Sequence, residues 1–382
     1  FECLLTWYVR KDVRGKNKSQ PELVCLISPD SVVPQNHPIR IIKKQVDEVL
    51  RRMSGLFDEM YANEGRPSIP PERLLKAKVL IALYSVRSEN LFCEQLQYNL
   101  LFRWFLDMDL AERVFDNSTF SKNQRRLLQH AVSEVFFAAV VELARENGWV
   151  SDDHFTVDGT LIEAWASLKS FQPREQKDEQ PPDDPGNPTV DFHGQKRSNQ
   201  THESKTDAEA RLARKGAGKE ARLSFGLHAL MENRNGLYID LKVSSATGTT
   251  EAKEALAQVR ELQEIHGLQP KTVGADKGYH QKDFVSGCRE IGVAPHVAEI
   301  KNRKVKGLDK RTTKKPGYQI SQKIRKQVEE GFGWMKTVGG FRKTRFKGIA
   351  RTQLCAHFVG AACNLVRMAR LALAPPLKNA AA

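Results

Sequence analysis

The sequence predicts an α+β protein of more than one domain, in which a helical N-terminal part precedes an α/β part with a mixed sheet and a long polar insertion. Apolar residues at helical spacing across residues 41–150 predict the first part. Short β-branched runs alternate with a helical pattern across residues 151–374 and predict the second. Between residues 171 and 222 this pattern gives way to Pro, Asp, Glu, Lys, Gln and Ser, which is typical of a mobile or partly ordered insertion.

The N-terminal part is predicted to contain several consecutive helices. Apolar residues at intervals of three and four predict one amphipathic helix over residues 41–61 that packs or dimerises. Pro70-Pro71-Glu72 predicts the start of a second helix that runs to about Val86, and residues 89–108 predict a third. Residues 1–40 are expected to form a poorly defined N-terminal segment.

A fourth helix is predicted through Phe120–Leu128, with Asn117-Ser118 as its cap. Its first turns, Asn117–Arg126, carry Ser, Asn, Gln and Arg, which are the residue types that contact base edges and phosphates. The segment is therefore a candidate DNA-reading helix. A solvated helix start with a basic end explains the same residues equally well.

The α/β part is predicted to begin with a strand that ends at Asp158, and a later strand over residues 272–275 is predicted to deliver Asp276. Asn233-Arg234-Asn235-Gly236 predicts a hairpin turn between these strands, because Asn-Gly is a strong short-range turn signal. The remaining predicted elements are a helix over residues 251–266, α/β elements around residues 293–297, a helix over residues 353–374 that covers the sheet, and a tail over residues 375–382.

Asp158 and Asp276 each follow a β-branched run and precede a glycine or a Lys-Gly pair. Ligands and metals gather at the carboxyl ends of strands in open α/β sheets. Two such aspartates and one helical glutamate would make an all-oxygen site of the kind that suits Mg²⁺ or Mn²⁺. The implied chemistry is phosphoryl transfer.

The segment Ile324–Lys336 places one carboxylate between two cations, because Arg325, Glu329 and Lys336 are four and seven residues apart. On one helix these side chains share a face. We therefore predict that Glu329, rather than its neighbour Glu330, faces the two aspartates. An exposed ion pair on a surface helix is the alternative explanation.

Together these motifs resemble the catalytic blocks of bacterial insertion-sequence DDE transposases, most closely the insertion-sequence-five-like group. The matching blocks, in the family's order, are Asp158-Gly159-Thr160, Ala275–Tyr279 and Val328–Lys336, and residues 66–126 resemble the group's helical N-terminal domain. The family often has a tyrosine where this chain has Gln322. The element order and the resemblance together imply a ribonuclease-H-like catalytic domain over residues 151–374, behind a helical DNA-binding domain over residues 41–150.

The resemblance implies that Asp158, Asp276 and Glu329 are catalytic and hold Mg²⁺ or Mn²⁺, as two ions bridged by Asp158. Arg325 and Lys336 would hold the scissile phosphate. The expected function is metal-dependent cleavage and strand transfer of an insertion sequence, with a homodimer acting on the terminal inverted repeats and target DNA. The alternatives are a non-catalytic, sequence-specific DNA-binding relic and a related metal-dependent nuclease that does not join strands.

The net charge of +14 favours a polyanionic partner. Residues 301–351, here called the basic region, hold seventeen Lys or Arg residues and three acids, interleaved with aromatic residues, which resembles a surface that faces nucleic acid. The residues predicted to contact DNA are Arg325, Lys336, Lys277, Arg342, Lys343 and Arg345.

Other functional classes find no support in the sequence. The six cysteines lack Cys-x2-Cys spacing, which indicates neither zinc nor disulfides and is typical of reduced cytosolic thiols. There is no Gly-x4-Gly-Lys-Ser/Thr loop and no Gly-x-Ser-x-Gly elbow, so ATPases and hydrolases of those kinds are excluded. No membrane segment is predicted, because the apolar stretch 357–374 is interrupted by two arginines. The expected location is the bacterial cytoplasm, in association with the nucleoid.

Overall fold

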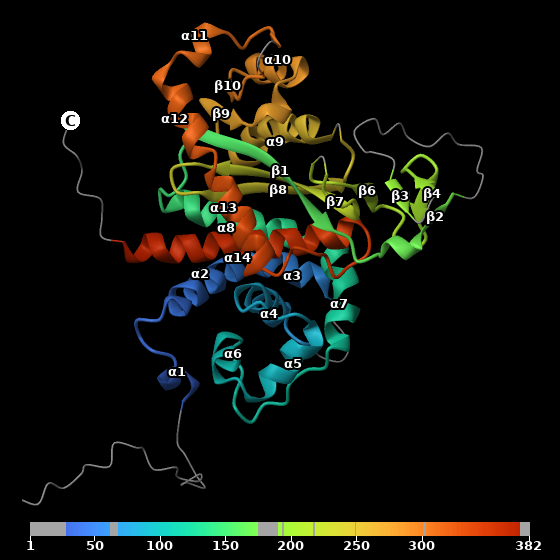
Figure 1. The fold of residues 1–382 in the computed structure, drawn as a ribbon. Coiled ribbons are helices and arrows are strands. Elements are labelled where there is room, and N and C mark those ends of the chain that lie inside the picture. The colour runs from blue at the N-terminus through green and yellow to red at the C-terminus, as the bar shows by residue number, and fades with distance from the viewer. Residues whose placement is uncertain are drawn as a thin grey trace, which may run out of the picture.

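The computed structural model describes residues 28–61, 68–174, 190–192, 195–216, 218–248, 250–300 and 303–374. A group of N-terminal helices lies beside a sheet domain, and the long helix α14 runs between them (Figure 1). The first dozen residues, much of the predicted insertion and the tail 375–382 lie outside the described residues.

The N-terminal part is mostly helical over residues 41–150, as predicted, and it also includes helical residues 29–32 and 38–40, where the sequence predicts a poorly defined segment. Its helices are α1 (Pro29–Val32), α2 (Pro38–Arg52), α3 (Ser54–Met60), α4 (Pro71–Leu83), α5 (Glu89–Tyr98), α6 (Leu100–Phe105), α7 (Ser118–Gln129) and α8 (Val132–Glu146). Their apolar faces meet in a common core that includes Val46, Leu80 and Phe92.

Two helices that the sequence predicts as single are each divided in two. The predicted helix 41–61 breaks at Met53, where the backbone leaves the helical region. The predicted helix 89–108 breaks at Asn99, because the Asn99 side chain accepts a hydrogen bond from the Phe102 N–H at 3.1 Å and so starts a new helix. The helix predicted to reach Val86 ends at Leu83, before Ser85 with its left-handed φ of 53°.

Helix α7 is present where the sequence predicts a helix, but its start is capped differently. Asn117 makes no side-chain capping bond, and Asp116 instead accepts a hydrogen bond from the Ser118 N–H at 2.7 Å. Within α7, Arg126 lies over the Tyr61 ring at 4.4 Å and donates to the Asn123 side chain. Lys122 and Arg125 are exposed on the same helix.

The central sheet is mixed and has the order β8-β7-β1-β9-β10, with β6 as an additional neighbour of β7. Strands β8, β7 and β1 are antiparallel, whereas β9 and β10 run parallel to β1. This is the ribonuclease-H-like arrangement. The strands are β1 (His154–Glu163), β6 (Arg211–Ala213), β7 (Arg222–Glu232), β8 (Leu237–Ser245), β9 (Thr272–Ala275) and β10 (Ala294–Val297).

The predicted hairpin is confirmed as β7 and β8, with Gly236 at a φ of +66° in the turn. The predicted helix 251–266 is α9 (Thr250–His266), and the C-terminal helix begins at Ile349 rather than Gln353. Described parts of the insertion form short strands: β2 (Phe171–Pro173), β3 (Val190–Phe192), β4 (Gln195–Arg197) and β5 (His202–Ser204). The remaining elements are η1 (Leu168–Ser170), η2 (Lys277–Tyr279), α10 (Lys282–Glu290), α11 (Lys310–Thr313), α12 (Pro316–Ile324), α13 (Gln327–Thr337) and α14 (Ile349–Leu373).

Helix α14 covers the outer edge of β8 and supplies the hydrogen bonds that another strand would supply. The side-chain amide of Asn364 accepts from the Tyr238 N–H at 2.8 Å and donates to the Tyr238 carbonyl at 2.7 Å. Gln353 accepts from the Val243 N–H at 2.6 Å and donates to the Leu241 carbonyl at 2.7 Å. Because α14 also packs on α2 and α4, it joins the sheet to the N-terminal helices.

Replacing Asn364 with leucine is expected to destabilise the protein by roughly 2–6 kcal/mol, because two buried backbone groups lose their partners at about 1–3 kcal/mol each. The check is the midpoint of urea unfolding followed by circular dichroism. Arg370→Leu, at an exposed position of the same helix, is the control and should shift the midpoint little. Equal midpoints for the two variants would show that the amide does not support the β8 edge.

His357 on α14 is buried and held as a neutral ring. Its Nδ1 lies 3.2 Å from the Ser133 hydroxyl, and its Nε2 lies 2.7 Å from the Gln353 amide nitrogen. That amide nitrogen is a donor, so Nε2 must accept and cannot carry a proton. Burial lowers the pKa of His357 to about 4.

This histidine should make the fold sensitive to acid. Its folded pKa lies below the unfolded value of 6.5, so the unfolded chain binds the proton first and stability is lost as pH falls from about 6.5 towards 4. The full loss is roughly 3 kcal/mol. We expect thermal melts at pH 7, 5.5 and 4.5 to fall less steeply for His357→Gln than for the wild type. Parallel pH profiles for the two proteins would contradict this assignment.

Candidate active site

Asp158 lies in the middle of β1, so the prediction that it ends a strand is wrong. Strand β7 pairs with β1 beyond this point, from Asp158 opposite Ala229 to Glu163 opposite Ser224. This pairing keeps the chain extended through the Asp-Gly pair. On its other side, however, β1 pairs with β9 only as far as Thr156. Beside Asp158, the edge of β1 that faces β9 therefore has no strand paired to it.

Asp276 lies at the position that the sequence predicts, directly after β9. Its carboxylate accepts the Gly278 N–H at 2.7 Å and caps the short helix η2. Because β9 ends here while β1 continues, Asp276 lies beside the free edge that carries Asp158. The end of β9 thus brings the two aspartates together.

The electrostatics of Asp158 reflect a concentration of negative charge. Burial, together with the nearby charges of Asp276, Glu251 and Glu329, raises its pKa to about 7. The Gly159 N–H, which the carboxylate accepts at 2.8 Å, opposes this increase. Among the described residues, none of these four carboxylates forms a salt bridge. The site therefore holds unbalanced negative charge that favours a bound cation.

Glu329 lies in the first turn of α13, but the single helix predicted for Arg325, Glu329 and Lys336 is interrupted. Helix α12 ends at Ile324, and α13 begins at Gln327. At this joint the hydrogen bonds shorten to i→i−3, from Val328 N–H to the Arg325 carbonyl and from Glu329 N–H to the Lys326 carbonyl. Arg325 and Lys326 keep right-handed helical backbone, so the chain continues in nearly the same direction.

The two cations predicted to flank Glu329, Arg325 and Lys336, have different hydrogen-bond partners. Lys336 Nζ donates to the Thr160 hydroxyl at 2.6 Å, two residues from Asp158 on the same strand. Burial, together with the charges of Lys215 and Arg342, lowers the pKa of Lys336 to about 8, so it remains mostly protonated at pH 7. Arg325 donates to the Gln322 side chain at 3.0 Å, within its own helix–turn segment.

The loop after α13 carries other basic residues to the end of β1. The Glu163 N–H donates to the Arg342 carbonyl at 3.1 Å, and the Thr344 N–H donates to the Glu163 carbonyl at 2.8 Å. Arg342 and Lys343 are exposed there, whereas Arg345 is partly buried and donates to the Val86 carbonyl at 2.8 Å. The Arg345 guanidinium thus already serves an internal contact.

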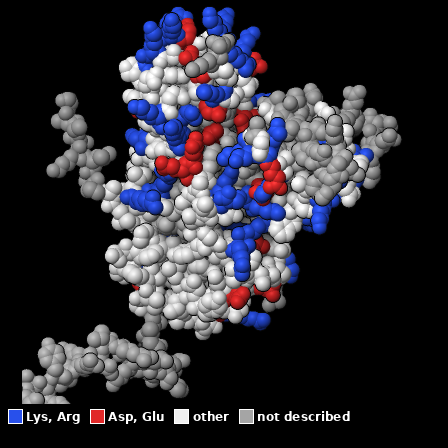
Figure 2. All heavy atoms as spheres, viewed as in Figure 1, with Lys and Arg blue, Asp and Glu red and all other residues white. Residues whose placement is uncertain are grey.

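The charges on the visible face form a pattern around the acids. Figure 2 shows a band of acidic side chains across the middle of this face, with Lys and Arg gathered on both sides of it. The part of this face below, formed by the N-terminal helices, is mostly uncharged. Lys277 begins η2 immediately after Asp276 and is exposed. A nucleic-acid backbone that contacts the Lys and Arg side chains on both sides would cross the acidic band.

Glu251, in the first turn of α9, is a carboxylate that the sequence reasoning missed. A Cβ placed on Gly159 would lie 2.8 Å from its Oε1, so its side chain rests on the strand beside Asp158. Burial and the charge of Asp276 raise the pKa of Glu251. An acid in a first helical turn is a common stabiliser of the helix dipole, and the sequence alone offers no signal to separate this one.

The donor chemistry of these residues fits a hard divalent ion, since carboxylate oxygens are the ligands that Mg²⁺ and Mn²⁺ prefer. In the described part of the chain, no three acid, histidine or cysteine side chains are already close enough to ligate one ion.

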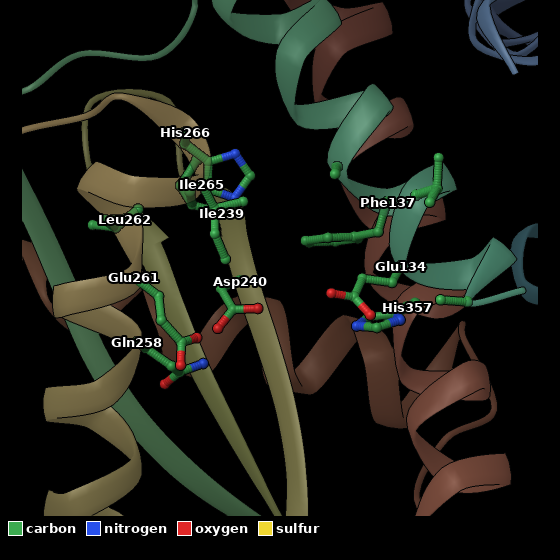
Figure 3. Close-up of a pocket in the computed structure, with 13 residues that line it drawn as sticks. Glu134, Phe137, Ile239, Asp240, Gln258, Glu261, Leu262, Ile265, His266 and His357 are labelled. Atoms are coloured by element: carbon green, nitrogen blue, oxygen red, sulfur yellow. The ribbon is translucent and has the colours of Figure 1, made fainter.

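A separate cavity of about 300 Å³ lies away from these acids, between α8, β8, α9 and α14 (Figure 3). Phe137, Ile239 and Leu262 line it together with Asp240 and His357.

Within the described residues, no single helix has the length and apolar character to cross a membrane. Helices α7 and α8, which are bent by 73° relative to each other, meet that test only as a pair.

The sheet order defines the class of ribonuclease-H-like proteins. Comparison with family profiles specifies the family: "Transposase DDE domain" matches residues 152–365, and "Transposase domain (DUF772)" matches residues 27–126. The chain belongs to the DDE transposase family, whose members cleave DNA and transfer the cut strand.

Solved structures of transposases are among those similar to this chain. The piggyBac transposase synaptic complex with hairpin DNA is 11% identical, with 86% of this chain and 73% of that chain covered and a TM-score of 0.37. The Mos1 transposase paired-end complex is 12% identical, with 74% and 83% covered and a TM-score of 0.20. At these TM-scores the likeness adds no detail to the site, and the family rests on the profile match.

Proposed function

We propose that this transposase belongs to the insertion-sequence-five-like group and that Asp158, Asp276 and Glu329 form its catalytic site, with one or two Mg²⁺ or Mn²⁺ ions. The observation that carries the proposal is the termination of β9 beside the middle of β1. Asp276 follows β9 next to Asp158, whose partly buried carboxylate feels the charges of other acids. Glu329 on α13 contributes its charge to the same place.

The chemistry consists of two phosphoryl transfers at one centre. In the first, a water oxygen bonds to phosphorus at the element's end, the bond from phosphorus to the 3′ oxygen breaks, and a free 3′-hydroxyl results. In the second, that hydroxyl attacks a target phosphate, gives up its proton and displaces a target 3′ oxygen. Bound divalent ions would supply activation of the attacking oxygen and stabilisation of the leaving one.

The basic residues around the acids position the phosphates in this proposal. Lys336 is fixed on Thr160 and lies beside Asp158, so its ammonium is placed to hold the scissile phosphate. Arg325 would contribute from the joint before α13. Lys277, Arg342 and Lys343 extend the positive surface along the DNA, whereas Arg345 would have to release Val86 to reach a phosphate.

DNA recognition is divided between two parts of the chain in this proposal. Residues 41–150 recognise the terminal inverted repeats, with Lys122 and Arg125 the exposed cations of α7. The basic region holds element and target phosphates without reading sequence. The active form is a homodimer that holds both element ends, and it works on the bacterial nucleoid in the cytoplasm.

The test uses purified full-length protein with duplexes that carry the inverted repeats flanking its gene. In Mg²⁺ or Mn²⁺ we expect cleavage at the repeat end and joining of the 3′ end to a target plasmid, and neither in EDTA. Binding without cleavage under all metal conditions would favour the DNA-binding relic. Cleavage without joined product would favour the nuclease.

A further inference from the structure

The side chain of Glu251 lies over β1, the strand that carries Asp158. Helix α9 begins at Thr250, directly after the β7–β8 hairpin, and packs against β1 and β7. This packing directs the Glu251 carboxylate to the backbone of Gly159, the residue that follows Asp158. The carboxylate therefore lies beside the free edge of β1 that Asp276 also faces.

Gly159 provides the room for this carboxylate. Its φ is not in the left-handed region, so the backbone conformation does not require glycine. Any larger residue would place its Cβ 2.8 Å from Glu251 Oε1, closer than such atoms approach. The Asp-Gly pair thus combines a ligand with the space for a second carboxylate.

A buried tyrosine points to an occupant of the same space. Tyr279 is 1% exposed, and its hydroxyl has no hydrogen-bond partner among the described residues. The carboxylates that act on it electrostatically are Glu251, Asp158 and Asp276. A buried hydroxyl without a partner costs about 1–3 kcal/mol, so a water or an ion's hydration shell is needed beside it.

A capping role does not account for Glu251. An acid that caps a helix accepts backbone N–H groups of the first turn. Within the described residues, no N–H donates to the Glu251 carboxylate and no cation pairs with it. Its charge adds to those of Asp158 and Asp276, and a cation would offset this repulsion.

We infer that Glu251 is a fourth carboxylate ligand of the catalytic metal, which it binds together with Asp158 and Asp276, and that Gly159 is glycine in order to admit it. The inference rests on the proposed function of this site. In this arrangement Glu251 holds an ion from the α9 side of β1, and Glu329 completes the site from α13. The Tyr279 hydroxyl donates into the same space.

The experiment measures Mn²⁺ binding to full-length protein without DNA, by isothermal titration calorimetry and by the loss of free Mn²⁺ signal in electron paramagnetic resonance. Glu251→Gln should raise the Kd for Mn²⁺ by about tenfold or more, since loss even of groups that only support a ligand costs 10–100-fold. Its melting temperature in EDTA should not fall, because a repulsive charge is removed. Glu264→Gln, at an exposed acid of the same helix, is the control and should bind Mn²⁺ like the wild type.

The outcomes separate this inference from the proposed function. If Asp158→Asn loses Mn²⁺ binding while Glu251→Gln keeps wild-type affinity, the role of Glu251 is overturned and the three-acid site stands. If the wild type itself neither binds Mn²⁺ nor cleaves DNA, both proposals fall. Should Glu251→Gln not fold, Gly159→Ala replaces it, because the added Cβ must displace the carboxylate. A folded Gly159→Ala variant with wild-type Mn²⁺ affinity would then overturn the inference.

Discussion

Replacing Asp158 or Asp276 with alanine is expected to lower metal-dependent DNA cleavage by about three orders of magnitude while leaving DNA binding largely intact. The factor corresponds to roughly 4 kcal/mol of transition-state stabilisation, within the several kcal/mol that a correctly held ion supplies. Binding should persist because the exposed cations Lys277, Arg342 and Lys343 hold phosphates independently of the carboxylates.

Cleavage of a labelled repeat-end duplex and gel-shift affinity, measured on the same preparations, test this expectation. Asp152→Ala is the matched control, since Asp152 precedes β1 and its carboxylate accepts the Gln269 N–H at 3.2 Å outside the site. Undiminished cutting by either aspartate variant in clean protein would remove that residue from the catalytic site. Equal loss of binding and cleavage would mean that the variant is misfolded or that the acids shape the DNA surface.

The second large effect separates Glu329 from Glu330. Adjacent residues on a helix are about 100° apart, so only one of the two carboxylates can face the aspartates. Both glutamates are exposed, but the charge of Glu329 acts on Asp158, whereas Glu330 does not enter the electrostatics of that carboxylate. Glu329→Gln should therefore abolish both cleavage and joining, and Glu330→Gln should retain substantial activity.

A pre-cleaved end with a free 3′-hydroxyl isolates the joining step from the first cut. Both variants are compared on this substrate and on the uncut duplex, with Mn²⁺ as well as Mg²⁺. An active Glu329→Gln beside an inactive Glu330→Gln would shift the third ligand by one residue. Such a result would also mean that the tight joint before α13 rotates the helix relative to β1.

The sequence predicts those parts of the fold that have local signals. The β7–β8 hairpin follows from Asn-Gly, and Asp276 is correctly placed because the β9 strand is short and is followed at once by η2. The prediction that Asp158 ends its strand is wrong because an Asp-Gly pair is typical of a turn, whereas pairing with β7 keeps the chain extended to Glu163. That pairing is a long-range contact without a local signal.

Two features of the site could not be read from spacing alone. The interruption between α12 and α13 depends on i→i−3 bonds at Arg325–Lys326, where no glycine or proline marks a break. Glu251 lies far from Asp158 in sequence and reaches it only because α9 packs across β1. Spacing predicts which residues share one helix face, but not which residues of two separate elements meet.

The contact between α14 and the β8 edge has a consequence for synthesis of the protein. The ribosome completes β8 long before Gln353 and Asn364 exist, and at roughly 5–20 residues per second the delay is on the order of ten seconds. Throughout that time Tyr238, Leu241 and Val243 present unpaired backbone groups that can bind another strand. Translation arrested before residue 349 would therefore leave a nascent chain with an open sheet edge, which is a substrate for chaperones or for aggregation.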